Sequence, residues 1–118
     1  MDFQEMIIKQ RDFDLEHGFK ITKKPLASKY NQVSHELIGL VGEIGELANI
    51  VKKMNVLLDN GIEIKTDIVH EKEDGIREEL IDVFIYLIRI SDIFELDLKK
   101  EYLKKIQKNI EKYRSFHE

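Results

Sequence analysis

Four acidic residues form two pairs with the same spacing, and they are the residues of this chain best suited to chemistry. Glu43 and Glu46 are three positions apart in LIGLVGEIGELANIVKK, and Glu79 and Asp82 are three positions apart in REELIDVFIY. At about 100° per residue, helical side chains with this spacing lie on one face. If the two helices pack antiparallel, the four carboxylates converge at the edge of the core.

Converging carboxylates need a cation or a proton. Two carboxylates about 5 Å apart repel by about 3 kcal/mol at an effective dielectric constant of about 20. Mg²⁺ and Mn²⁺ prefer oxygen ligands of this kind, so the acids predict a Mg²⁺ site that Mn²⁺ can also occupy. The histidines, at positions 17, 35, 70 and 117, form no Glu-x-x-His pair with these acids, which argues against a di-iron bundle. For each pair alone, an ordinary solvated helix face is the alternative.

Three glycines surround the first acid pair within an otherwise helical pattern. Gly39, Gly42 and Gly45 each cost about 1 kcal/mol relative to alanine in a helix interior. Glycine removes a side chain, which leaves room for a hydrated metal and its substrate or lets another helix pack closely. Gly42 is the one expected to face the site.

The apolar periodicity predicts an all-α fold of four helices in a single domain over residues 1–118. The first helix is expected over Phe3–Glu16, and the second from an N-cap at Ser28 to about Leu58. The third is expected from about Ile76 to Glu95, and the fourth, capped by Asp97, to about Phe116. The polar, unperiodic residues 61–75 predict a loop.

The third helix carries more apolar surface than a small domain can cover. In the third helix one stripe consists of Leu80, Val83, Phe84, Leu87 and Ile90, while Ile81, Ile85 and Ile88 lie off it. In the fourth helix Leu98, Tyr102, Ile106 and Ile110 are expected on the inner side. Apolar residues around much of a helix need cover on several sides. We therefore expect a four-helix-bundle-like domain assembled into a homodimer or homotetramer.

Composition excludes several classes of protein. The chain has no cysteine, so disulfides and thiolate metal sites are impossible. Its net charge of −4 gives no general attraction to nucleic acid or to an anionic membrane. No apolar run approaches the ~20 residues that span a bilayer, and MDFQEMIIKQRDFD lacks the apolar segment of a secretion signal. A cytoplasmic protein is expected.

The combination of GEIGELANIVKK with REELIDVFIYLIRISD resembles the all-α nucleoside triphosphate pyrophosphohydrolases, the MazG-like superfamily that includes dCTP and dUTP pyrophosphatases. Their signature is E-x-x-E on one helix and E-x-x-D on the next, matched here by Glu43, Glu46, Glu79 and Asp82. The resemblance implies that these acids hold Mg²⁺ and are catalytic. It also implies cleavage of a (d)NTP between the α and β phosphates to (d)NMP and pyrophosphate, in nucleotide-pool house-cleaning.

The resemblance extends to residues that would contact the substrate. A Lys, Asn and Tyr pattern spaced by four in LKKIQKNIEKYRSF gives Lys105, Asn109 and Tyr113, and Tyr86 falls where dCTP-type members carry a tyrosine. Those members surround the base with tryptophans, whereas this chain has none and carries Lys52 and Lys53 at the corresponding point.

Stacking on the base would fall to an aromatic residue other than tryptophan, and the preferred base stays open. The aromatic candidates are Phe13, Phe19, Tyr30 and Tyr86. Lys52, Lys53 and Arg77 are candidates for phosphate contacts, although lysines on such helices often serve only solubility. His35 is expected to pack or to cap.

A second hypothesis belongs to another class of protein. A non-catalytic helical module, oligomeric and engaged in interaction or regulation, would keep the helices and bind partners. The excess apolar surface of the third helix favours it, and the presence of all four acids argues against it.

Overall fold

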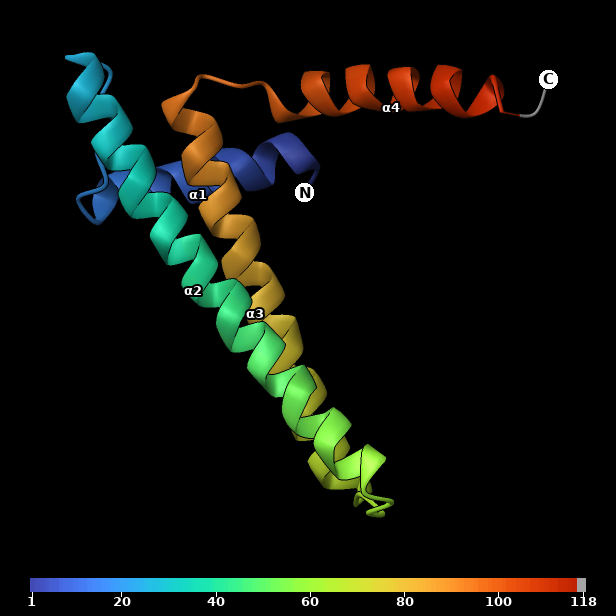
Figure 1. Ribbon diagram of the computed structural model, residues 1–118. Helices are drawn as coiled ribbons and strands as arrows, with labels where there is room; N and C mark the ends of the chain where they lie inside the picture. Colours follow the sequence, from blue (N-terminus) through green and yellow to red (C-terminus); the bar gives the residue numbers. More distant parts are fainter. Residues whose placement is uncertain (117–118) are drawn as a thin grey trace.

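The protein consists of four α-helices over the residues that the computed structural model describes, 1–116, with no strand among them (Figure 1). The helices are α1 (Phe3–Glu16), α2 (Leu26–Asp59), α3 (Thr66–Ile93) and α4 (Leu98–Arg114). The all-α prediction with four helices is confirmed. None of the helices within these residues combines the length and apolar character needed to cross a membrane.

Two helices begin at side-chain caps. Asp2 accepts a hydrogen bond from the Glu5 backbone N–H at 2.9 Å, and the Glu5 carboxylate accepts one from the Asp2 N–H at 3.3 Å, which forms a capping box. Asp97 accepts from the Lys100 N–H at 3.1 Å, so the predicted cap of α4 is confirmed. These caps satisfy backbone donors that have no partner within the helix.

The second helix begins earlier than predicted. Pro25, not Ser28, occupies the N-cap position, and its carbonyl accepts from the backbone N–H groups of Ser28 and Lys29 at 3.0 and 3.1 Å. Proline has no N–H to leave unpaired, and its fixed φ suits entry into a helix. The Ser28 prediction was therefore wrong by one turn.

The predicted loop over 61–75 was also wrong, because α3 begins at Thr66. The link between α2 and α3 is short, and Gly61 turns it with a φ of +66°. The first turns of α3 are polar because they flank only the last part of α2. The two helices touch here: a Cβ added to Gly75 would meet Ile50 at 3.4 Å. A helix that contacts one neighbour along a narrow face buries few side chains, so its sequence shows no apolar periodicity. The other end of α3 is Ile93, close to the predicted Glu95.

An antiparallel hairpin of α2 and α3 forms the body of the molecule, and α1 crosses α3 near its C-terminal end (Figure 1). Few hydrophobic side chains of the described residues are fully buried, and they gather at this crossing: Ile7, Val33, Ile88 and Ile93. Ile88 was predicted to lie off the main stripe and to need cover from another subunit, but it is 1% exposed within the chain. The small core therefore lies at one end of a long hairpin.

The last helix, α4, extends away from the other three (Figure 1). Tyr102, Ile106 and Ile110, predicted on its inner side, are 64%, 37% and 45% exposed. The radius of gyration is 18.9 Å, against about 13.5 Å for a compact domain of this length. The four helices thus do not close into a bundle within one chain. The first turns of α4 border α1 and α3, where Leu98 and Tyr102 line an open apolar hollow, and its later turns extend beyond them.

Close contact between α2 and α3 requires one glycine in particular. A Cβ added to Gly39 would lie 2.5 Å from the Tyr86 ring, closer than real Cβ contacts come. Added to Gly42 or Gly45, it would meet nothing within 4 Å. Gly39 therefore serves helix packing, while Gly42 and Gly45 lie beside open space.

Two matched substitutions test this difference. Gly45→Ala should raise the free energy of unfolding by about 0.5–1 kcal/mol, because alanine is the better helix former and the site is open. Gly39→Ala should lower it, since the Tyr86 ring must move. Thermal unfolding measures both. A destabilised Gly45→Ala would contradict the prediction and reveal packing against that face.

Candidate metal centre

Three of the four predicted acids converge between α2 and α3. Glu43 comes from α2, Glu79 and Asp82 come from α3, and one carboxylate oxygen of each lies within 4.8 Å of the other two. All three side chains are partly buried. We call these three residues the acid cluster. The antiparallel hairpin creates it because each helix carries its acids on the face that borders the other helix.

Glu79 lies at the centre of the negative charge. Its pKa is raised to about 7, first by the Glu43 carboxyl group, which is close enough to share a proton with it. Burial, a hydrogen bond with the Glu46 carboxyl and the negative charge of both neighbours act in the same direction. Glu46 therefore lies beside Glu79, although it is exposed and stands outside the acid cluster.

The cluster lacks donors for its buried oxygens. Oε2 of Glu43 and Oε2 of Glu79 are both buried, and no described residue donates a hydrogen bond to either. Buried carboxylate oxygens without donors are costly unless a proton or a cation satisfies them. An oxygen-only ligand set of three converging carboxylates fits a hard divalent cation such as Mg²⁺ or Mn²⁺.

Tyr86 is the one predicted substrate contact that the chain places next to the acid cluster. It follows Asp82 by one turn of α3, and its ring lies against Gly39 of α2. The Arg89 guanidinium lies over the same ring, 5.3 Å from its centroid. The ring is therefore held between a helix backbone and a cation.

The other predicted contacts lie farther away. Lys52 and Lys53 are exposed on α2, beyond the acids. Lys105, Asn109 and Tyr113 belong to α4, which extends away from the hairpin, so one chain does not bring them to the acid cluster (Figure 1).

The remaining candidates have other partners. Arg77 pairs with acids of its own helix, at 2.7 Å from Asp74 and 3.6 Å from Glu73. Tyr30 contacts Phe94 edge to face, with ring centroids 6.1 Å apart. Phe19, another predicted aromatic candidate, lies near the same guanidinium as Tyr86. The centroid of the Phe19 ring is 5.8 Å from Arg89 Cζ. His35 is exposed.

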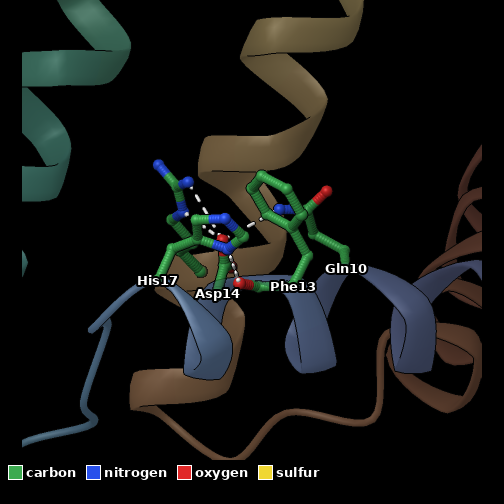
Figure 2. Close-up of polar contacts among 5 residues, drawn as sticks. Gln10, Phe13, Asp14 and His17 are labelled. Carbon is green, nitrogen blue, oxygen red and sulfur yellow. Dashed lines mark hydrogen bonds and ion pairs between the residues drawn. The ribbon is translucent and has the colours of Figure 1, made fainter.

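A buried ion pair close to Tyr86 was missing from the sequence prediction. Asp14 of α1 is 2% exposed, and its Oδ1 accepts from Arg89 Nη2 at 3.0 Å and Nε at 3.2 Å. Gln10 Nε2 donates to the same oxygen at 2.9 Å (Figure 2). One signal was available in the sequence: Asp14 follows Ile7 by seven positions and so shares its buried face.

Figure 2 also shows Phe13 and His17 beside Asp14 at the end of α1. Their rings stack with centroids 4.1 Å apart, and His17 Nδ1 lies 2.7 Å from the Phe13 carbonyl oxygen. Phe13 is 52% exposed. This predicted stacking candidate thus stacks on His17 at the end of its own helix.

A helical hairpin that gathers carboxylates from both of its helices defines an all-α protein with an acidic site suited to a divalent metal. The family model of the MazG nucleotide pyrophosphohydrolase domain matches residues 33–118, and the chain belongs to this family. The resemblance to the MazG-like superfamily is thereby confirmed. Comparison with curated proteins and with solved structures gives no match.

The raised pKa of Glu79 predicts how stability depends on pH without metal. The folded protein keeps a proton on Glu79 up to a pKa of about 7, whereas the unfolded chain releases it near 4.5. Stability in chelator should therefore fall as the pH rises from about 4.5 to about 7. Thermal melts of the parent and of Glu79→Gln across this range provide the measurement. The variant should lose this part of the dependence, and identical profiles would contradict the assignment.

Proposed function

We propose that this protein is a Mg²⁺-dependent nucleoside triphosphate pyrophosphohydrolase that cleaves (d)NTPs between the α and β phosphates. The products are a (d)NMP and pyrophosphate, and the role is house-cleaning of the nucleotide pool. One observation carries the proposal: the acid cluster, with buried oxygens that lack donors, in a chain of the MazG family.

The acids have distinct places in this proposal. Glu43, Glu79 and Asp82 would hold the divalent cation, and Glu46 would complete the set from its exposed position beside Glu79. When bound, the cation supplies positive charge to the triphosphate oxygens and lowers the pKa of an attacking water. Glu46 lies outside the cluster, so its carboxylate is the one best placed to accept a proton from that water.

The substrate would extend from the acid cluster toward Tyr86. The acids would hold the cation that meets the phosphate oxygens, and the ring of Tyr86, one turn away on α3, would contact the nucleoside. Lys52 and Lys53 are exposed cations on the other side of the acids and would neutralise charge on the departing pyrophosphate.

A panel of (d)NTPs with Mg²⁺ tests the proposal. We expect pyrophosphate as the primary product, no turnover in chelator, and a loss of at least 100-fold in turnover for Glu46→Gln, because the variant loses a charged ligand and proton acceptor. Glu71→Gln, a change of an exposed acid on α3 outside the cluster, serves as the control and should keep full activity.

Two outcomes of that panel would contradict the proposal. Orthophosphate as the primary product would indicate cleavage at the γ phosphate. No turnover of any nucleotide would favour the second hypothesis, a non-catalytic oligomeric module, which the exposed apolar surface also fits.

We include a homodimer or homotetramer in the proposal. The accessible surface of the chain is 9249 Å², whereas a compact protein of 14.0 kDa exposes about 6,700 Å². The excess exceeds the roughly 800 Å² that one partner buries in a standard interface. An apolar hollow between α1, α3 and α4 lies in this surface, lined by Phe3, Phe84, Leu87, Leu98 and Tyr102 among others.

A second copy would also explain the place of α4. Lys105 and Asn109 extend away from the acids of their own chain, so they can contact substrate only at the site of another chain. The proposed site is therefore completed across subunits.

Mixing two inactive variants tests this arrangement. Glu79→Gln removes an acid, and Asn109→Ala removes a contact from α4. If the site is shared, the two refolded together should recover about a quarter of the parent activity, because half of the dimers are mixed and each has one intact site. Light scattering should give at least a dimer mass for the parent. A monomer, or no recovery on mixing, would contradict the prediction.

A further inference from the structure

The Arg89 guanidinium interacts with three parts of the chain: α1, its own helix α3, and the segment between α1 and α2 that contains Phe19. It arises from α3, donates two hydrogen bonds to Oδ1 of Asp14 on α1, and lies over the rings of Tyr86 and Phe19. Its side chain is 24% exposed, against 2% for Asp14. A planar guanidinium suits this position because it can hydrogen-bond along its edge and stack on an aromatic ring at the same time.

The Tyr86 ring has little freedom between its neighbours. On one side the α2 backbone at Gly39 is so close that even a methyl group would collide with the ring, at 2.5 Å. The Arg89 guanidinium lies over the ring, with its Cζ atom 5.3 Å from the ring centroid. Removing either restraint would let the ring turn away from the position it holds beside Asp82.

The charges around Arg89 hold it in place. The hydrogen bonds that Arg89 donates to Asp14 are the main cause that raises the pKa of Arg89, and the charge of Glu36 acts in the same direction. Glu36, on α2, has its own pKa raised, chiefly by burial and against the pull of Arg89. The Arg89 guanidinium is thus hydrogen-bonded to Asp14 and attracted by the charge of Glu36.

We propose that Arg89, anchored by Asp14 of α1, is a positioning residue that fixes the Tyr86 ring at the nucleoside end of the site. This role rests on the proposed function. It gives α1 a part in substrate binding without any contact between α1 and the substrate. It also separates the binding of the nucleoside from the chemistry at the phosphates, because Arg89 does not belong to the acid cluster.

A second ion pair provides a matched control. Arg11 of α1 contacts Asp92 of α3, with 2.6 Å between Nε and Oδ1, and Asp92 is buried. It links the same two helices as Asp14 and Arg89 do, but within the described residues the Arg11 guanidinium does not lie over the Tyr86 ring. Arg11→Met therefore removes a comparable structural link and leaves the restraint on Tyr86 intact.

The experiment compares the parent, Arg89→Met, Arg89→Lys and Arg11→Met. For the best (d)NTP, Arg89→Met should raise KM about ten-fold and change kcat less than three-fold, because a cation–π contact and its geometry are lost while the acids remain. Arg89→Lys keeps the charge and should recover part of the loss. Arg11→Met should leave KM within two-fold of the parent.

Binding gives a readout that is independent of turnover. The dissociation constant of a non-hydrolysable α,β-methylene nucleotide should follow KM across the four proteins. Gly39→Ala, which displaces the ring from the opposite side, should weaken this binding as well, and it keeps the test decisive if Arg89→Met fails to fold. Equal effects of Arg89→Met and Arg11→Met on KM and on binding would overturn the positioning role while leaving the activity established. A parent without pyrophosphohydrolase activity would overturn the proposed function and this role with it.

Discussion

The close antiparallel contact of α2 with α3 is the constraint on which the rest of the structure depends. Gly39 permits it, because any larger residue would collide with the Tyr86 ring at the point of contact. That contact sets the register of the hairpin, and the register brings Glu43 opposite Glu79 and Asp82. A shift of one residue along either helix would rotate its acids by about 100° and disperse the cluster.

The same contact creates an electrostatic cost that the fold alone does not remove. At the acid cluster, Glu43 and Glu79 each have one buried oxygen without a donor. The neighbouring Glu43 carboxyl group, followed by burial and Glu46, raises the pKa of Glu79 to about 7. Two turns farther along α3, the Arg89 guanidinium donates to Asp14 of α1, which is more deeply buried than the acids of the cluster. Asp14 thus has a cation within the chain, whereas the acid cluster is a group of carboxylates that could hold a metal ion.

Features that depend on local residue spacing could be predicted from the sequence. Features that depend on packing against other helices could not. The three-residue spacing of each acid pair was enough to place them on two helix faces, and the cap at Asp97 followed from its residue type. The start of α3 at Thr66 could not be read, because its first turns flank a single helix and so carry no apolar stripe.

Other failures came from contacts between distant segments. The burial of Ile88 depends on cover from another helix. The exposure of α4 depends on the direction in which it leaves α3. The pairing of Asp14 with Arg89 joins residues 75 positions apart, a separation over which helical periodicity carries no information.

The proposed function requires that the acid cluster binds a divalent cation in place of the proton that Glu79 holds. Calorimetric titration of Mn²⁺ into the metal-free protein at pH 6.5, in two buffers with different enthalpies of ionisation, tests it most directly. With the pKa of Glu79 at about 7, binding should release a proton, so the observed heat should differ between the buffers in proportion to their ionisation enthalpies. Glu79→Gln should bind more weakly and show no such difference. Binding without proton release, or no binding by the parent, would contradict the account.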